Sequence, residues 1–273
     1  MKNVVITGSS TGIGLGLAKE FLKKGCNVAL TSFAKDELAE AYEQVVGEFG
    51  ADKVMSHACD VSIYEEVEGL WKAAKEKFGT IDIWVNNAGI SNSTAPVWGV
   101  EPGQMKAVIN TNVVGTLYGF RVAMLGMTEQ GSGDIYNFYG HGSWDEFAPP
   151  GLTVYGTSKR AVRYMTEALI GEMKESPIRL GWMMPGLVMT DFVKKVVLAV
   201  PAGPAREGLK KSISVMADTV DTVTPWLVDE CLKNVEAGTH GAEINYMTPE
   251  KAASRKEDPY YLNRDLFENI EGV

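Results

Sequence analysis

The chain has 273 residues, 45% of them hydrophobic, and this length suits one α/β domain with a sizeable core. The formal net charge of −9 disfavours nucleic acid as a partner, and no stretch reaches the roughly 20 apolar residues of a membrane span. Cys26, Cys59 and Cys231 form neither a C-x-x-C motif nor a disulfide framework, which favours a reducing, cytoplasmic location. The three histidines lie far apart without ligand spacing, so no metal site is expected.

Short apolar runs of strand-forming residues alternate with helical patterns along the chain. Strands are expected at Val4–Thr7, Asn27–Thr31, Val54–His57, Ile81–Val85, Asp134–Phe138, Ile178–Met183 and Ala242–Met247. Helices are expected at Gly14–Lys24, Asp36–Phe49, Tyr64–Phe78, Gly103–Thr128 and Val154–Glu175. This alternation predicts an α/β fold: a doubly wound, Rossmann-type, mostly parallel seven-stranded sheet with helices on both faces.

The elements are expected to form a single domain over residues 1–273, because no linker or repeat divides the chain. Residues from about 192 to 221 break the rhythm, since Pro201, Gly203 and Pro204 separate two short helical pieces. An irregular insertion of this length is often functional, and it is interpreted as a substrate lid. A C-terminal extension, about 248–273, is polar with an apolar cluster and is expected to dock on its own or a neighbouring subunit.

The first strand-to-helix connection reads Thr7-Gly8-Ser9-Ser10-Thr11-Gly12-Ile13-Gly14. Its glycines let the backbone approach a ligand, and the free N–H groups at the start of the next helix favour a pyrophosphate. The T-G-x-x-x-G-x-G spacing resembles that of the short-chain dehydrogenase/reductase family, which implies a nicotinamide dinucleotide as cofactor. The residues of this loop expected to bind it are Gly8, Ser10, Thr11, Gly12, Ile13 and Gly14.

Tyr155 and Lys159 share one face of a predicted helix, because they are spaced i, i+4. A cation within reach favours a phenolate and lowers the pKa of a tyrosine by about 1–3 units. Tyr155 can then exchange a proton with a substrate oxygen while the nicotinamide carries a hydride. Located downstream of the glycine loop, this Y-x-x-x-K spacing is similar to the family's catalytic pair, which also contacts the cofactor.

Further segments match the family in the same order, and the resemblance covers about residues 3–192. It implies cofactor contacts from Asp60 and Val61 to the adenine, from Asn87, Ala88 and Gly89, and from Pro185, Gly186, Val188 and Thr190 to the nicotinamide carboxamide. Asp60 has an equal alternative role as a cap of the next helix. Asn112 matches the asparagine whose distorted helix holds a water in a proton relay behind the lysine.

The fourth catalytic position is less well defined in this sequence. The family commonly has a pair of serines after the fifth strand, and here Tyr139-Gly140 takes its place. Ser143 stands at acceptable spacing before Tyr155 and is expected to donate a hydrogen bond to the substrate oxygen. Tyr139 or His141 is the alternative donor. This loop, with Ile81–Gly89, also resembles the chlorophyll(ide) b reductase branch of the family.

The end of the second strand is the region that distinguishes NAD from NADP, because a carboxylate there binds the ribose 2′-OH and repels a 2′-phosphate. Ser32 occupies the carboxylate position, and Phe33 stands where many NADP-dependent relatives carry arginine. The missing carboxylate, the hydroxyls of Ser32 and Thr11 and the nearby Lys35 favour NADP(H), while NAD(H) remains possible.

The expected function is NAD(P)(H)-dependent interconversion of a ketone and a secondary alcohol by Asn112, Ser143, Tyr155 and Lys159. Apolar residues in the loop before Tyr155 and in the insertion favour a bulky, steroid-like or polycyclic small molecule, although these residues equally suit packing or a subunit contact. The loop residues are Trp144, Phe147, Pro149 and Pro150; those of the insertion are Phe192, Val193, Val196, Val197, Leu198, Leu209, Ile213 and Met216.

Two alternative functions follow from the same sequence. One is a catalytically silent dinucleotide-binding sensor or scaffold, for which the altered serine loop is the only support. The other is an enzyme of the same family that reduces a C=C bond or isomerises its substrate. The resemblance further implies a homodimer or homotetramer formed through the helices that carry Asn112 and Tyr155.

Overall fold

The computed structural model describes residues 1–92, 94–144, 151–268 and 270. Phe147, Pro149 and Pro150, expected near the substrate, lie outside the described residues. Seven strands form one sheet in the order β3-β2-β1-β4-β5-β6-β9, and every neighbouring pair is parallel. Their bounds are Asn3–Ile6 (β1), Asn27–Ser32 (β2), Val54–Ala58 (β3), Ile83–Asn86 (β4), Gly133–Phe138 (β5), Ile178–Met184 (β6) and Glu243–Asn245 (β9).

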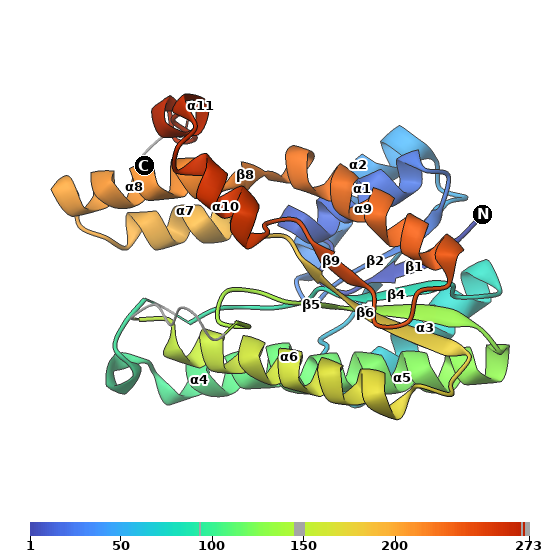
Figure 1. The fold of residues 1–273 in the computed structure, drawn as a ribbon. Coiled ribbons are helices and arrows are strands. Elements are labelled where there is room, and N and C mark those ends of the chain that lie inside the picture. The colour runs from blue at the N-terminus through green and yellow to red at the C-terminus, as the bar shows by residue number, and fades with distance from the viewer. Residues whose placement is uncertain (93, 145–150, 269, 271–273) are drawn as a thin grey trace.

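Helices cover both faces of this sheet, in two layers that Figure 1 shows above and below it. The first layer consists of α1 (Gly12–Lys23), α2 (Lys35–Phe49) and α9 (Val220–Ala237). The second consists of α3 (Tyr64–Phe78), α5 (Gly115–Gln130) and α6 (Thr153–Glu172), with α4 (Pro102–Ile109) beside α6. The predicted doubly wound fold is therefore confirmed.

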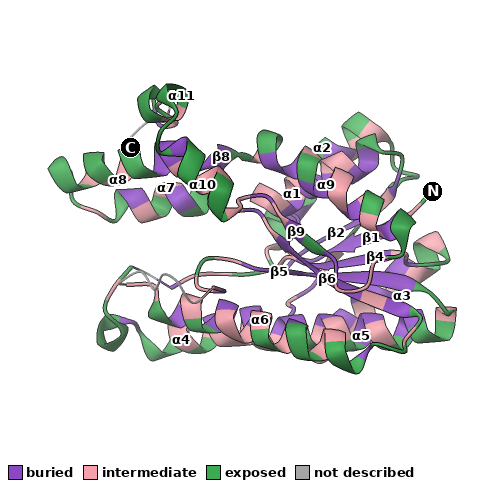
Figure 2. Cartoon of the chain, in the orientation of Figure 1, coloured by how far each residue is buried: buried purple, intermediate pink, exposed green. Residues whose placement is uncertain are grey.

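The sheet is buried on both faces, which explains why its strands read as continuous apolar runs (Figure 2). Val4 and Ile6 of β1 pack in the core under α1, α2 and α9, whereas Val5 between them packs in the core under α3, α5 and α6. The strand order reverses between β1 and β4, so connections leave their carboxyl ends in opposite directions. A crevice at this point is where doubly wound sheets bind ligands.

The insertion forms ordered elements: α7 (Asp191–Leu198), α8 (Pro204–Met216) and β8 (Asp218–Thr219), and β7 (Val188–Met189) directly precedes it. β7 and β8 pair in parallel as a small second sheet at the base of the insertion. The C-terminal extension continues with α10 (Pro249–Arg255) and α11 (Pro259–Asn263), which lie against α8. In Figure 1 these elements form a lobe that projects beyond the carboxyl end of the sheet, opposite α4 and the start of α6.

The long helix expected at Gly103–Thr128 is interrupted rather than continuous. It consists of α4, a π-helical turn η2 (Asn110–Val114) and α5. A short 3₁₀ turn, η1 (Val97–Gly99), precedes α4. The π-helical turn adds one residue per hydrogen-bonded ring, and it reorients the side chains that follow.

Candidate active site

The glycine loop between β1 and α1 has a backbone that only glycine fits at its critical positions. Gly8 and Gly12 have positive φ values of 63° and 56°. A Cβ on Gly14 would lie 2.2 Å from the Gly8 carbonyl oxygen, and one on Gly8 would lie 2.8 Å from Cα of Ala88. Thr11 is the N-cap of α1, and its side chain makes no capping hydrogen bond. The first turn of α1 is therefore open to an anionic group, as a dinucleotide phosphate requires.

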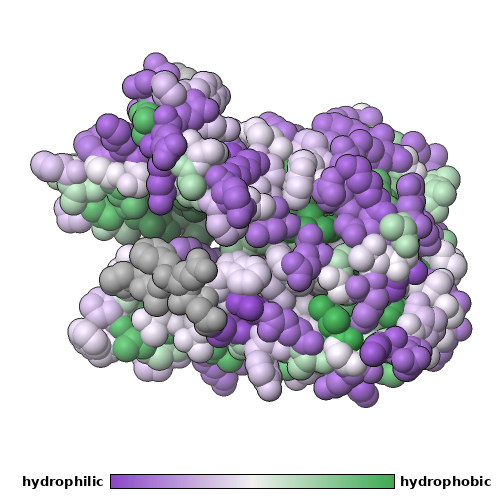
Figure 3. All heavy atoms as spheres, in the orientation of Figure 1, coloured by the Kyte–Doolittle hydropathy of each residue, from purple (hydrophilic) through white to green (hydrophobic). Residues whose placement is uncertain are grey.

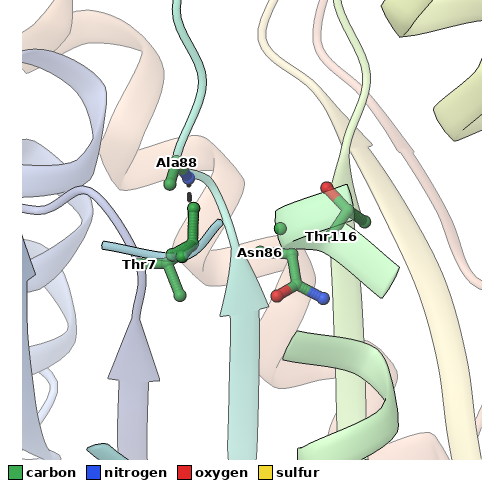
Figure 4. A pocket seen from close by; sticks show the side chains of 6 residues that line it. Thr7, Asn86, Ala88 and Thr116 are labelled. Carbon is green, nitrogen blue, oxygen red and sulfur yellow. Dashed lines mark hydrogen bonds between the residues drawn. The ribbon is translucent and has the colours of Figure 1, made fainter. Parts of the chain in front are cut away.

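The end of β4 is fastened to this loop by side-chain hydrogen bonds. Asn87 donates from Nδ2 to the carbonyl oxygens of Thr7 and Gly8, both at 2.9 Å. The Thr7 hydroxyl accepts the N–H groups of Asn87 and Ala88, each at 3.0 Å. Figure 4 shows the small recess beside these contacts, with Thr7, Asn86, Ala88 and Thr116 around it. The two connections at the switch point thus form one rigid edge of the crevice.

The segment after β6 closes the other side of the glycine loop. Gly186 has a φ of 74° and turns the chain so that Val188 enters β7, where it is buried. Thr190, the N-cap of α7, approaches Gly12: a Cβ on this glycine would lie 3.5 Å from Cγ2 of Thr190. Pro185 is buried at the end of β6. These four predicted cofactor residues therefore stand across the crevice from the start of α1.

The ends of β2 and β3 provide the remaining predicted cofactor residues. Ser32 is buried, and its hydroxyl accepts the Ala34 N–H at 3.2 Å, whereas Phe33 is 70% exposed at the rim. The Asp60 carboxylate accepts from both the N–H and the hydroxyl of Ser62, at 2.9 and 2.7 Å. Asp60 therefore stabilises the turn before α3, but it does not cap this helix, whose N-cap is Ile63 without a side-chain capping hydrogen bond. Val61 is buried against Gly115 at the start of α5.

Tyr155 and Lys159 lie on the inner face of α6, at the carboxyl end of β5. The Lys159 ammonium donates to the Phe138 carbonyl oxygen at 3.1 Å and lies 5.9 Å from the centre of the Tyr155 ring. Burial lowers the pKa of Lys159 to about 8 and raises the pKa of Tyr155 to about 12. At neutral pH Lys159 therefore still carries its proton, but less firmly than an exposed lysine, whereas Tyr155 is the neutral phenol.

Asn112 lies in the π-helical turn and is 99% buried, since only 1% of its surface is exposed. Its Oδ1 accepts the Ile90 N–H at 2.8 Å, and its Nδ2 donates to the Ile90 carbonyl at 2.9 Å and to the Ser158 hydroxyl at 2.9 Å. Gly89 stands between Asn112 and Lys159, because a Cβ there would lie 3.4 Å from Asn112 Oδ1 and 3.6 Å from Lys159 Nζ. The structure therefore brings Asn112, Tyr155 and Lys159 together as expected from the sequence.

Ser143 requires a correction, because its hydroxyl does not face the crevice. The side chain is fully buried; Oγ donates to the Lys159 carbonyl at 3.3 Å and accepts the Gly140 N–H at 3.2 Å. A hydroxyl has a single proton to donate, so Ser143 holds backbone groups in this structure instead of offering a donor to a substrate oxygen. The spacing between Ser143 and Tyr155 in the sequence therefore did not determine where the Ser143 hydroxyl points.

Of the two alternative donors, Tyr139 is held inside the protein, whereas His141 lies at the surface. Tyr139 is buried, stacks on Trp182 with ring centres 4.7 Å apart, and points its hydroxyl toward the Arg163 carbonyl at 3.5 Å. His141 is exposed in the turn, and partial desolvation lowers the pKa of its imidazole. The Tyr155 hydroxyl lies against Gly140 instead: a Cβ on this glycine would be only 2.5 Å from it.

Asn92 is a site residue that the sequence analysis missed. It is buried; Oδ1 accepts the Tyr155 N–H at 3.0 Å, and Nδ2 donates to the Gly151 carbonyl at 3.0 Å. It therefore fixes the first turn of α6, where Tyr155 stands. No spacing pattern signals this role, because the partners are backbone groups about 60 residues away in sequence.

The apolar residues of the insertion divide into two groups. Val193, Val197 and Ile213 pack with Phe267 of the C-terminal extension in a small core of their own. Phe192 and Leu198 are 44% and 43% exposed, and the Phe192 ring lies 6.4 Å from that of Tyr155. Figure 3 shows a hollow between this lobe and the part that carries α4 and α6, with apolar surface on its upper side. The first group therefore packs within the protein, as one of the two interpretations of these residues expected. Phe192 instead lies at the crevice beside Tyr155.

The described residues also bear on metal sites and on membrane-spanning helices. No group of three or more His, Cys, Asp or Glu side chains there is arranged to hold a metal ion. Likewise, none of the helices in the described part of the chain has the length and apolar character needed to cross a membrane.

Comparison with known proteins agrees with this geometry. Residues 2–200 match the family model for short chain dehydrogenases. The chain is 34% identical over 231 residues to chlorophyll(ide) b reductase NOL, chloroplastic, of Oryza sativa subsp. japonica, a match that covers 83% of this chain and 65% of that protein. It spans between 50% and 65% of the length of the plant relatives of this kind that it matches.

Two solved structures show the same fold. An NAD⁺-bound xylitol dehydrogenase superposes with a TM-score of 0.79 and 24% identity, over 90% of this chain and 97% of that one. L-sorbose reductase from Gluconobacter frateurii, complexed with NADPH and L-sorbose, has a TM-score of 0.77 and 25% identity, over 89% and 94% of the two chains. The chain therefore belongs to the short-chain dehydrogenase/reductase family of oxidoreductases, whose members among these neighbours bind NAD or NADP.

Proposed function

We propose that this protein is an NADP(H)-preferring carbonyl reductase and alcohol dehydrogenase. One observation carries the proposal: Tyr155, Lys159 and Asn112 lie together beside the crevice at which an uncapped helix start and a glycine loop suit a dinucleotide. The loop fits this cofactor because added Cβ atoms at Gly8 and Gly14 would clash with backbone. Residues 8–14, 87–89 and 185–190 would hold the cofactor.

Bound nicotinamide supplies or accepts the hydride, so a ketone and a secondary alcohol interconvert when one proton is also moved. Tyr155 gives its phenolic proton to the carbonyl oxygen in reduction and takes it back in oxidation. The Lys159 ammonium stabilises the resulting phenolate, and the positive charge of an oxidised nicotinamide acts in the same direction. Asn112 holds the Ile90 segment and Ser158 around this pair, through the hydrogen bonds described above.

The preference for NADP(H) rests on the absence of a carboxylate at the end of β2. Ser32 stands there, and Lys35 begins α2 close by. A 2′-phosphate at this place meets no like charge from residue 32 and gains attraction from the lysine. NAD(H) lacks this phosphate and is expected to bind more weakly.

The proposed substrate is a bulky, apolar ketone or alcohol, steroid-like or polycyclic. Support comes from the exposed Phe192 beside Tyr155 and from the apolar side of the hollow under α7 and α8 (Figure 3). The relative from rice is named as a chlorophyll(ide) b reductase, which is also consistent with a large substrate.

The proposed assembly is a homodimer or homotetramer through α5 and α6. These helices carry Leu117, Leu125 and Tyr164, whose exposed fractions are 41%, 51% and 75%. Exposed apolar side chains on neighbouring helices are typical of a subunit contact. Sedimentation equilibrium tests the proposed assembly, and a monomer at all concentrations would exclude it.

The location in the cytoplasm stays a prediction.

The first experiment is a titration of the purified protein with NADPH and with NADH, followed by nicotinamide fluorescence. A panel of bulky ketones is then added while absorbance at 340 nm is recorded. Saturable NADPH binding and ketone-dependent oxidation are expected. Tyr155→Phe should lower turnover by at least about 10²-fold while cofactor binding persists, because only the proton donor is lost.

Other outcomes of this experiment favour other functions. Binding without oxidation by any ketone would favour the silent sensor or scaffold. Oxidation that yields a product without a new hydroxyl group would favour C=C reduction. If neither nucleotide binds, or if Tyr155→Phe keeps normal turnover, the proposal is wrong.

A further inference from the structure

The residue that faces the Tyr155 hydroxyl is a glycine. A Cβ on Gly140 would lie 2.5 Å from Tyr155 Oη and 3.1 Å from Cε of Lys159. Gly140 directly follows β5 and occupies one of the two positions where the family commonly has serine. Because no side chain stands at this position, the Tyr155 hydroxyl can pack directly against the backbone of Gly140.

A tight turn places this glycine, and Ser143 joins the turn to α6. The Ser143 N–H donates to the Gly140 carbonyl at 3.0 Å, and the Ser143 hydroxyl accepts the Gly140 N–H. The same hydroxyl donates to the main-chain carbonyl of Lys159. One fully buried oxygen thus connects the end of β5 with the residue of α6 that carries the ammonium group.

Further contacts hold the same turn on the same helix. Gly142 has a φ of 96° and packs directly on Gly156, since a Cβ on it would lie 2.5 Å from Cα of Gly156. Arg160 donates from Nε to the Gly142 carbonyl at 3.1 Å, and Arg163 donates to the Ser143 carbonyl at 3.2 Å. With its main-chain groups bound in this way, the turn has a defined position relative to Tyr155.

We propose that Ser143 is a positioning residue, which holds the Gly140 turn on α6, and that Gly140, having no side chain, lets the Tyr155 hydroxyl lie against this turn in its catalytic position. In this arrangement Tyr155 is the side chain that binds the substrate oxygen, and Ser143 acts only through the backbone of Gly140 and Lys159. The proposal rests on the proposed carbonyl reduction. It assigns Ser143 a role that differs from direct donation to the substrate.

The first test uses Ser143→Ala and follows ionisation of Tyr155 rather than turnover alone. The ¹³Cζ signal of labelled tyrosine is titrated in the free protein and with NADP⁺, and the Tyr155 signal is assigned by its loss in Tyr155→Phe. The charged or ionisable groups at the described part of the turn are Lys159, Arg160 and Arg163 on α6 and His141 in the turn itself. If the turn loosens in Ser143→Ala, the Lys159 ammonium should move away from Tyr155. The phenolate then loses a stabilising positive charge, so the pKa of Tyr155 should rise by more than about half a unit.

Kinetics then separate positioning from direct donation. For Ser143→Ala, a fall in kcat of about 10-fold is expected, with KM little changed. The limb of the pH profile that reports ionisation of Tyr155 should move to higher pH: the acidic limb for alcohol oxidation and the basic limb for ketone reduction. A fall of about 10²-fold or more at every pH, with the Tyr155 titration unchanged, would indicate a lost donor to the substrate and overturn the proposal. Wild-type behaviour in both measurements would overturn it as well.

Thr166→Val is the matched control for loss of a buried hydroxyl on α6. Thr166 is fully buried, donates to the Val162 carbonyl at 2.7 Å and accepts from Asn137 at 2.9 Å. It lies far along the helix from Tyr155, so the variant should lower thermal stability without moving the Tyr155 titration. If Thr166→Val moves that titration as much as Ser143→Ala does, a general loosening of α6 is responsible and the proposal fails.

Gly140→Ala tests the second half of the proposal. The added methyl group should displace the Tyr155 hydroxyl and lower kcat by about 10²-fold, while NADPH affinity changes by less than a few-fold. A variant that melts normally, binds NADPH and keeps wild-type turnover would overturn it. If the wild-type protein reduces no carbonyl compound at all, the proposed function fails, whereas the Tyr155 titrations still decide the role of Ser143.

Discussion

Lys159 is subject to two opposed requirements. Its ammonium group must be charged to stabilise a Tyr155 phenolate, but the group is 94% buried, and this burial lowers its pKa to about 8. The hydrogen bond to the Phe138 carbonyl replaces only part of its hydration. At neutral pH the folded protein therefore holds a charged group in an unfavourable place, for a reason that is functional rather than structural.

Lys159→Met should therefore stabilise the protein without cofactor at pH 7. The difference between a pKa of about 8 when folded and 10.5 when unfolded corresponds to about 3 kcal/mol, present as destabilisation below pH 8. Between about pH 8 and 10 the unfolded chain binds more protons, so stability of the wild type rises with pH and the advantage of the variant shrinks. Thermal melts at pH 7 and 9.5 check this.

Lys159→Arg is the control, because an arginine keeps its charge throughout this pH range. It should show no rise in stability between pH 8 and 10. A Lys159→Met variant that is less stable than the wild type at pH 7 would contradict the prediction, since the hydrogen bond to Phe138 would then outweigh the burial of charge.

Ser32 is expected to determine the choice between the two cofactors. Ser32→Asp places a carboxylate at the end of β2, which should weaken NADPH binding at least about 10-fold and leave NADH binding equal or tighter. Fluorescence titration with both nucleotides measures the ratio of dissociation constants. Ser32→Asn has nearly the same shape without the charge and serves as the control. An unchanged ratio in Ser32→Asp would show that the 2′-position lies elsewhere.

The i, i+4 spacing predicted Tyr155 and Lys159 as neighbours, and the resemblance to the family added Asn112 to this pair. The orientation of Ser143 was not predictable in this way. It depends on the contact of Gly142 with Gly156 and on the hydrogen bonds of the turn to α6, which are tertiary. Asn92 was missed for the same reason, because it acts on the backbone of a distant helix.

At the scale of elements, close helix packing depends on glycines whose role periodicity does not reveal. Gly126 of α5 lies under the indole of Trp71 on α3, and a Cβ there would be 2.0 Å from Trp71 Cζ2. Gly126 is thus buried inside the subunit and is not on the exposed face of this helix. The alternation of strands and helices was predictable from the pattern of apolar residues along the chain. The depth at which each helix packs was not predictable from this pattern.

Gly126→Ala should therefore destabilise the protein by about 1–3 kcal/mol, because Trp71 must move. Gly47→Ala is a matched change on α2, at an exposed position where an added Cβ meets nothing within 4 Å. There, higher helix propensity should stabilise by about 0.5–1 kcal/mol. Urea denaturation measures both. Effects of equal sign in the two variants would show that packing against Trp71 is not what requires a glycine.

The interruption of the predicted helix Gly103–Thr128 has a physical cause that the hydrophobic pattern conceals. Asn112 stands in the π-helical turn with its side chain bound to both backbone groups of Ile90. These bonds hold the extra residue in place. The apolar periodicity continues through the turn, so the pattern alone predicts one continuous helix.

At the scale of the whole molecule, one buried acid connects three parts of the chain. Asp218, at the start of β8, accepts hydrogen bonds from Arg255 of α10, from Arg264 at 3.3 Å, and from the Tyr246 hydroxyl at 2.9 Å. Arg255 and Arg264 lie over the ring of Tyr261, at 4.4 and 4.5 Å. The C-terminal extension thus docks on its own subunit. It supports β8, whose partner β7 leads into Thr190.

Arg255→Met should consequently affect both stability and the insertion. The variant leaves Asp218 buried with one arginine less, and removal of one partner from a buried ion pair costs about 3–5 kcal/mol. Because β8 pairs with β7, amide hydrogens of residues 188–217 should exchange faster, whereas amides of β1 and β4 should keep their protection. NADPH affinity should fall as well, because β7 leads into Thr190, one of the proposed cofactor residues. Hydrogen exchange by mass spectrometry with and without NADPH measures this.

Lys251→Met, which removes a more exposed cation over the Tyr246 ring at 3.3 Å, should change neither exchange nor affinity. Uniformly faster exchange across the sheet in Arg255→Met would mean that Asp218 supports global folding and not the insertion in particular.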